Sequence, residues 1–210
     1  MRTTTFDPAD LQADLFGTPQ PTIDGFALRL DYLDADEEAA LIETIATLPL
    51  HEARYKGYTA RRRVASYGTQ YDFDANELQR GAPLPESLHA LRRKAAAWLD
   101  VAPEAFSNAL VAEYRPGTPL GWHRDVPDFE QIVGVSLLAP ARMRLRRYPP
   151  APAHVREVLA IELPPRSAYV LQREARWGWQ HSIAPTAALR YSITFRTPAL
   201  RPPRGEPRSA

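Results

Sequence analysis

The sequence has no cysteine among its 210 residues. That absence excludes disulfides, iron–sulfur clusters, thiolate zinc sites and cysteine nucleophiles, so any metal must be held by histidine and carboxylate side chains. The chain also lacks an apolar run of membrane-spanning length, and its first residues, MRTTTFDPADLQADLFG, lack the continuous apolar segment of a signal peptide. We therefore expect a cytoplasmic protein that contacts no membrane.

A strong net charge is missing too, since the formal charge is only +1. The basic residues are nevertheless grouped in two clusters, Arg61–Arg63 and Arg142, Arg144, Arg146 and Arg147. Local clusters matter more than total charge for a phosphate-bearing partner. Each cluster taken alone fits such a partner and an ordinary solvated surface about equally well.

A short strand is expected at 26–33, and apolar spacing predicts two helices, at 34–50 and 85–100, the first with Asp34 as its N-cap. Residues 51–75 mix tyrosine, arginine and glycine and are expected to form a loop-and-hairpin segment. From 108 to 198 the pattern changes to short strands separated by proline and glycine turns, which is typical of a sandwich or jelly roll. We therefore predict an α+β fold with two N-terminal helices packed on one face of the sheet. A single domain is expected over 26–198, after a flexible arm (1–25) and before a disordered, proline-rich tail (199–210).

The stretch GWHRD (121–125) carries a candidate metal site. In an extended segment residues i and i+2 point to the same side, so His123 and Asp125 face one point. A further histidine, His181, follows 56 residues after Asp125. Two histidines and one carboxylate form the facial triad of non-haem Fe(II) oxygenases, whereas a structural zinc site would normally be closed by a fourth ligand.

The stretch RYSITFR (190–196) places Arg190 and Arg196 six residues apart on one predicted strand. The even spacing directs both guanidinium groups to one face, with Cα atoms roughly 20 Å apart. Guanidinium matches the two oxygens of a carboxylate. The pair therefore indicates a clamp for a short dicarboxylate next to the candidate metal ligands.

Together, EYRPGTPLGWHRD (113–125), REARWGWQHSI (173–183) and RYSITFR resemble the AlkB family of Fe(II)/2-oxoglutarate-dependent dioxygenases. The resemblance covers about residues 50–197 and implies a double-stranded β-helix (jelly roll) with Fe(2+) at its mouth and with 2-oxoglutarate and O2 as co-substrates. It implies that the iron ligands are His123, Asp125 and His181. It implies that 2-oxoglutarate is bound by Arg190, Arg196, Tyr114 and Ser192.

The family also implies a reaction: oxidative demethylation of N-alkylated bases in DNA or RNA, releasing formaldehyde, succinate and CO2. Residues 51–75 resemble the family's substrate-recognition lid, in which Arg61, Arg62 and Arg63 would bind phosphates. Tyr71 and Phe73 would hold an extruded base, unless these aromatics only pack the hairpin onto the sheet.

The chain departs from the family pattern around the substrate. Val126 and Pro127 follow Asp125 where repair enzymes often carry an acid, and Ala112 and Ser192 replace frequent asparagines. Two alternatives therefore stay open: the same chemistry on a protein side chain or small molecule, and a non-catalytic jelly-roll metal-binding module. A further hypothesis concerns Gln12–Phe16, QADLF, which resembles the peptide by which bacterial DNA enzymes dock on the sliding clamp. We expect a monomer.

Overall fold

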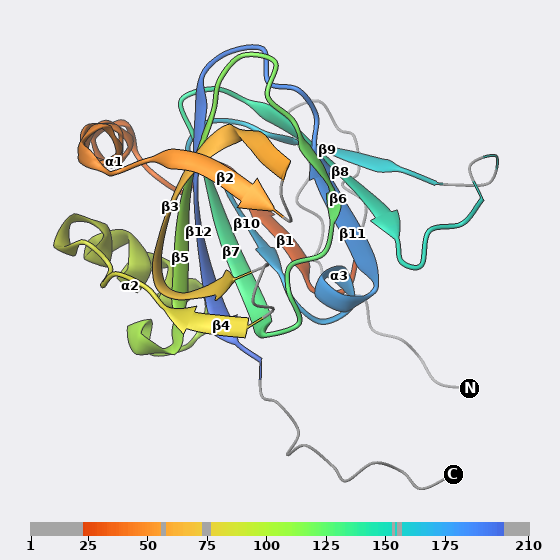
Figure 1. Cartoon of the computed structure of the whole chain (residues 1–210), viewed down its shortest axis with the longest axis horizontal. Helices are drawn as coiled ribbons and strands as arrows, with labels where there is room; N and C mark the ends of the chain where they lie inside the picture. The colour runs from red at the N-terminus through yellow and green to blue at the C-terminus, as the bar shows by residue number, and fades with distance from the viewer. Residues whose placement is uncertain (1–22, 56–57, 73–76, 153, 155–156, 200–210) are drawn as a thin grey trace, which may run out of the picture.

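The structure is a computed structural model that describes residues 23–55, 58–72, 77–152, 154 and 157–199 (Figure 1). Side chains are described for these residues except 54–60 and 70–78. The helices are α1 (Ala35–Thr47), α2 (His89–Leu99) and α3 (Arg173–Trp177), with 3-10 turns at Glu86–Leu88 and Pro103–Ala105. The strands are β1 (Phe26–Arg29), β2 (His51–Tyr55), β3 (Tyr58–Asp72), β4 (Glu77–Arg80), β5 (Asn108–Tyr114), β6 (Leu120–His123), β7 (Phe129–Leu137), β8 (Ala141–Arg147), β9 (Leu159–Leu163), β10 (Ala168–Leu171), β11 (Trp179–Ile183) and β12 (Arg190–Pro198).

The described strands form two antiparallel sheets. The larger is eight-stranded, in the order β1-β10-β7-β12-β5-β3-β2, with β4 paired to β3; the smaller has the order β6-β11-β8-β9. Apolar side chains from both sheets form one core cluster, in which Ile132 of β7 and Leu171 of β10 join Met143 and Leu145 of β8. The predicted α+β double-stranded β-helix is confirmed.

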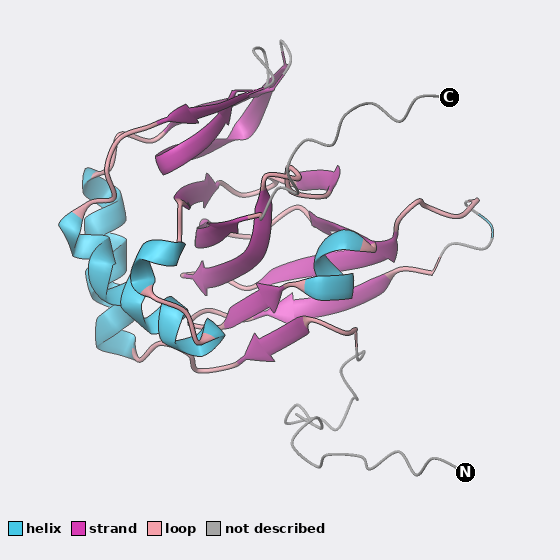
Figure 2. Cartoon of the chain, turned by 90° about the horizontal axis from the view of Figure 1, so that it is seen from below, coloured by secondary structure: helices cyan, strands magenta, loops and turns pink. Residues whose placement is uncertain are grey.

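The opposite face of the large sheet is covered by α1 and α2 (Figure 2). Alternation along the strands separates the two faces: Val133 and Val135 of β7 point to the helix side, where they cluster with Leu41 and Ile45 of α1. Ile132 and Ser136 of the same strand point the other way. The helices therefore close one side of the sheet and leave its other side to the site.

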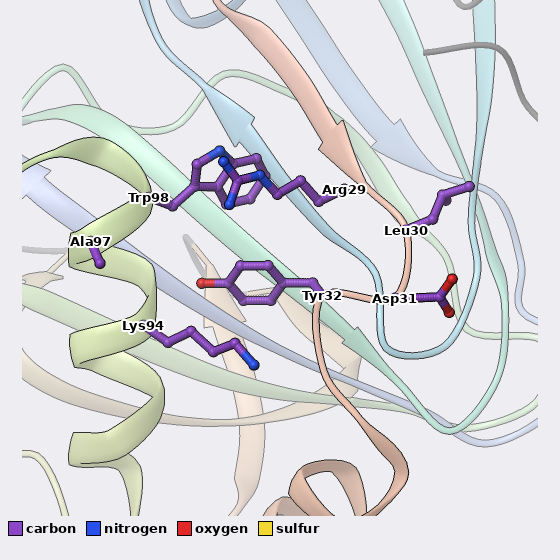
Figure 3. A pocket seen from close by; sticks show the side chains of 7 residues that line it. All are labelled: Arg29, Leu30, Asp31, Tyr32, Lys94, Ala97 and Trp98. Carbon is purple, nitrogen blue, oxygen red and sulfur yellow. The ribbon is translucent and has the colours of Figure 1, made fainter.

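A polar and aromatic cluster ties α2 to the segment after β1 (Figure 3). The rings of Tyr32 and Trp98 lie 5.3 Å apart, with the Arg29 guanidinium 4.6 Å from the Trp98 ring centroid. Lys94 of α2 lies 5.3 Å from the Tyr32 ring centroid and forms an ion pair of 2.6 Å with Glu37 of α1. Arg29, Tyr32, Lys94 and Trp98 line a surface cavity of about 530 Å³ on the helix side of the sheet.

Two segments differ from the sequence-based expectation. The strand expected at 26–33 ends at Arg29, because Asp31 adopts a positive φ of 47° that turns the chain toward α1. The segment 51–75, expected to be a loop and hairpin, does contain an antiparallel hairpin of β2 and β3, but β3 is a strand of 15 residues and both strands belong to the large sheet. Its role as a lid stays a prediction.

At the ends of the chain, the described part begins where the predicted arm meets the domain. Ile23 is buried, and the carbonyl of Gly25 accepts a hydrogen bond of 3.0 Å from the backbone of Gln172. Residues 1–22, including the QADLF segment Gln12–Phe16, and the tail 200–210 lie outside the described residues. Of the helices that are described, none is both long and apolar enough to cross a membrane.

We predict that Asp34→Ala lowers the free energy of unfolding by about 1 kcal/mol, because it removes a helix cap. Asp34 Oδ1 accepts a 2.7 Å hydrogen bond from the Glu37 backbone, and Glu37 Oε2 accepts one of 2.9 Å from the Asp34 backbone. This is a capping box at the start of α1. Urea denaturation followed by circular dichroism measures the change. Asp36→Ala, which removes a first-turn acid outside the box, is the control; an equal loss in both variants would contradict the assignment.

Candidate metal centre

His123, Asp125 and His181 converge on one point. Their ligand atoms all lie within 4.8 Å of one another, and they are the group of this kind found among the described residues. The sheet pairing explains the long separation in sequence, since His123 of β6 lies directly opposite His181 of β11. The two imidazole centroids are 4.2 Å apart. Asp125, two residues beyond His123, places Oδ1 3.5 Å and 3.6 Å from the Nε2 atoms of the two histidines.

The hydrogen bond at the far side of His123 orients its ring. Nδ1 lies 2.9 Å from the carbonyl oxygen of Gly121. A carbonyl only accepts, so Nδ1 carries the proton and Nε2 presents a lone pair toward Asp125 and His181. This is the tautomer that a metal ligand needs.

The protonation states of the other two residues also suit a cation. Burial, followed by the positive charges nearby, lowers the pKa of His181 to about 3, so this imidazole is neutral near pH 7. For Asp125, burial alone would raise the pKa. The Arg196 guanidinium is the largest of the opposing effects, which together outweigh burial and hold the pKa of Asp125 well below its usual value. A neutral imidazole and an ionised carboxylate are the forms that bind metals.

Arg196 connects the carboxylate to the large sheet. Its Nε donates a 2.5 Å hydrogen bond to Asp125 Oδ2, and its Nη1 donates one of 2.8 Å to Asn108 Oδ1. Asn108 Nδ2 in turn donates a 2.7 Å hydrogen bond to the carbonyl oxygen of Thr69 on β3. The second carboxylate oxygen is thereby occupied, which leaves Oδ1 facing the histidines. Sequence reasoning found Arg196 but not Asn108, which carries no motif of its own.

Arg176, on the short helix α3, is a further residue that sequence reasoning missed. Its side chain is 2% exposed and donates to the carbonyls of Asp125, Val126 and Phe129 at 2.7–3.1 Å. It therefore holds the loop that follows the metal-binding pair. The only sequence signal was its position five residues before His181.

Arg190, at the other end of the predicted clamp, has an unsatisfied donor. The residue is 1% exposed, and its Nε donates a 3.2 Å hydrogen bond to Ser136 Oγ. Its Nη1 is buried and has no hydrogen-bond partner in the described structure. Its guanidinium lies 4.9 Å from the Tyr114 ring centroid, and Ser192 lies beside the Tyr114 hydroxyl. A buried donor without an acceptor fits a ligand carboxylate. The residues present therefore fit a divalent metal at one end and a dicarboxylate reaching toward the other.

Tyr169 of β10 lies between these two ends and was also missed. Burial raises its pKa, and the charges that act on it belong to Arg190, Tyr114, Asp125 and Arg196. Its ring passes over Gly134 of β7, where a Cβ would come within 2.3 Å of the ring carbon that bears the hydroxyl. Glycine at 134 therefore makes room for the ring.

The substrate residues predicted on β3 do not form one basic surface. Strand alternation separates them: Arg61 is exposed, whereas Arg63 pairs with Glu113 at 3.2 Å and Arg62 lies beside the Tyr114 hydroxyl inside the site. Contact of Arg61, Arg62 and Arg63 with phosphates stays a prediction. The side chain of Tyr71, and Phe73 altogether, lie outside the described residues.

We predict that Arg176→Met weakens binding of Mn(II), measured by calorimetric titration, by about 10- to 100-fold. Without the guanidinium, the three loop carbonyls lose their donor and Asp125 is no longer held toward the histidines. Arg173→Met, on the same helix but exposed, is the matched control. Unchanged Mn(II) affinity in a folded Arg176→Met protein would show that the loop holds its geometry without this side chain.

Comparison with known proteins agrees with this geometry. The model of the 2OG-Fe(II) oxygenase superfamily matches residues 31–196. Uncharacterized protein L905 of Acanthamoeba polyphaga mimivirus is 29% identical over 197 residues, which is 83% of this chain and 85% of that protein. The solved structure of OsALKBH1 matches with a TM-score of 0.67 and 15% sequence identity, covering 85% of this chain and 99% of that one. The chain therefore belongs to the 2OG-Fe(II) oxygenase superfamily, has the fold of an AlkB homologue, and is a dioxygenase that uses Fe(2+), 2-oxoglutarate and O2.

Proposed function

We propose that this dioxygenase oxidatively demethylates N-alkylated bases in DNA or RNA. In this proposal His123, Asp125 and His181 hold the iron, and 2-oxoglutarate lies between Arg196 and Arg190. The bound iron, with 2-oxoglutarate and O2, supplies the oxidising power to hydroxylate an N-methyl group, which then leaves as formaldehyde while 2-oxoglutarate becomes succinate and CO2. The proposal rests on the site geometry for the chemistry and on one surface for the substrate.

The protein's contribution to the chemistry is orientation and the exclusion of water. Arg196 fixes the carboxylate of Asp125 from behind, and Gly121 fixes the ring of His123 through its carbonyl. His181 is 8% exposed and sits among apolar side chains of the small sheet, so it meets little solvent. His123, with a side chain 33% exposed, lies on the open side of the site, from which a substrate approaches.

The substrate assignment rests on what we name the arginine–aromatic surface, formed by Trp122, Arg124, Arg144, Arg146 and Tyr148. The guanidiniums of Arg144 and Arg146 lie 5.1 Å and 4.3 Å from the Trp122 ring centroid, and that of Arg124 lies 3.6 Å from the Tyr148 centroid. Interleaved guanidiniums and aromatic rings suit single-stranded nucleic acid, because the cations track phosphates and the rings accept bases.

The charge of this surface is available to a partner at two positions. Arg124 donates to the carbonyl of Trp177 and Arg144 to the hydroxyl of Ser182, both neutral acceptors. By contrast Arg142 and Arg147, which belong to the same sequence cluster, form ion pairs with Glu162 and Glu174. Within the second predicted cluster, Arg142 and Arg147 are thus offset by carboxylates, whereas Arg144 donates to a neutral acceptor.

The location of the surface relates it to the iron site. Trp122 immediately precedes His123 on β6 and therefore points to the opposite face of the strand. Arg144 and Arg146 flank Leu145 of β8, the residue paired with His181. The surface is consequently the outer side of the same small sheet whose inner side carries the two histidines, and β6 is the edge strand. A nucleic acid strand lying on it passes beside the open side of the site.

We predict that Arg124→Gln/Arg144→Gln weakens binding of a single-stranded oligonucleotide that carries an N-methylated base. The logarithmic salt dependence of binding should become shallower by about 1.4, roughly 0.7 for each lost phosphate contact. Fluorescence anisotropy across a salt series, with Mn(II) in place of iron, measures it. Arg142→Gln/Arg147→Gln removes the same charge from positions already paired with glutamates and is the matched control. Equal effects in the two double variants would argue against a specific surface.

We further predict that His123→Ala abolishes release of formaldehyde and succinate, measured by mass spectrometry on a panel of methylated oligonucleotides and peptides. The substitution removes one of three iron ligands. His51→Ala, which changes an exposed histidine, should retain activity. Release from peptides alone would move the substrate to a protein side chain, and turnover that no panel member stimulates would favour a small molecule. Full activity of His123→Ala would contradict the iron assignment.

A further inference from the structure

Three residues form a row across the floor of the site, on three neighbouring strands. Tyr114 of β5 lies opposite Arg190 of β12, and Val64 of β3 lies opposite Ala112 of β5. Continuing this antiparallel register by two residues places Arg62 opposite Tyr114 on the other side. Adjacent strands are about 4.8 Å apart, so the Cα atoms of Arg62 and Arg190 are about 10 Å apart with the tyrosine between them.

The side chains of this row lie close together. Arg62 and Ser192 lie beside the Tyr114 hydroxyl, and the Arg190 guanidinium lies 4.9 Å from the Tyr114 ring centroid. Burial by itself would raise the pKa of Tyr114, but the charges and hydrogen bonds of Arg62 together with the charge of Arg190 lower it. The surroundings of this oxygen therefore attract negative charge.

Both arginines retain a donor that the protein does not satisfy. Arg62 Nε and Arg190 Nη1 are buried and have no hydrogen-bond partner in the described structure. The nearby carboxylates on either face of the sheet are engaged elsewhere: Asp125 pairs with Arg196, and Glu113 pairs with Arg63 and Arg115. A buried, charged donor without a hydrogen bond costs free energy, so we expect a ligand to supply an anion at this end of the site.

We infer that Arg62 binds the distal carboxylate of 2-oxoglutarate together with Arg190 and Tyr114. The co-substrate is then held by a third arginine. This arginine belongs to β3, a strand within the predicted substrate lid. Arg62 thereby acts as a determinant of co-substrate specificity, favouring 2-oxo acids that carry a second carboxylate. It also ties β3 to the co-substrate, because a ligand bound to Arg62 bridges β3 and β12.

The test is calorimetric titration of the full chain, loaded with Mn(II) without oxygen, with 2-oxoglutarate. Arg62→Gln should raise the Kd by about 10- to 100-fold, since it removes a charge-assisted hydrogen bond to a carboxylate. Arg62→Lys should raise it less, because the charge remains while the fork geometry is lost. Arg61→Gln, one residue away on the exposed face of β3, is the matched control and should leave the Kd unchanged.

A second ligand separates a contact from a general disturbance of the site. 2-Oxobutyrate has the same 2-oxo acid group but no distal carboxylate, so its weaker binding should be the same in wild type and Arg62→Gln. An unchanged Kd for 2-oxoglutarate in Arg62→Gln would overturn the inference. Equal weakening of both ligands would overturn it as well, because it would make Arg62 a structural residue. No nucleic acid enters these assays, so their failure leaves the demethylation proposal standing.

Discussion

The ion pair between Arg196 and Asp125 is the interaction on which the site depends. It joins the last strand of the large sheet to the loop that leaves the small sheet, and it keeps the carboxylate ionised despite burial. A buried ion pair of this kind is stable only when its remaining hydrogen-bond donors and acceptors also have partners. Here Asn108 takes a second nitrogen of Arg196, and Arg176 holds the loop backbone from the opposite side.

Strand alternation gives the same few strands two different functions. On β6 and β11, one set of side chains faces the metal while Trp122, Gln180 and Ser182 face outward, where Gln180 and Ser182 support Arg146 and Arg144. On β3, Arg62 points into the site while Arg61 and Arg63 point away. A cluster of arginines in sequence is therefore not a cluster in space, and only the outward-facing members can meet a polyanion.

The fold was predictable because its signals are local. The Asp34 cap, the apolar stripe of α1 and the short strands after residue 108 depend on neighbouring residues, and the structure contains the corresponding elements. The strand pairing was not readable in the same way. Residues 51–75 suggest a loop and hairpin because tyrosine, arginine and glycine are mixed there, yet pairing with β5 makes β3 a long strand of the large sheet.

The sequence limits the chemistry of the site: without cysteine, a metal site had to be built from histidine and carboxylate side chains. The spacing of His123 and Asp125 indicated two metal ligands, and the spacing of the two arginines indicated a carboxylate clamp. How these groups are used depends on the tertiary structure. It brings His181 opposite His123, places Arg62 beside Tyr114, and adds Asn108, Arg176 and Tyr169 to the site. The type of each side chain can be read from the sequence. Its hydrogen-bond partners and its burial cannot, because they come from strands that are far apart in the chain and adjacent in the sheet.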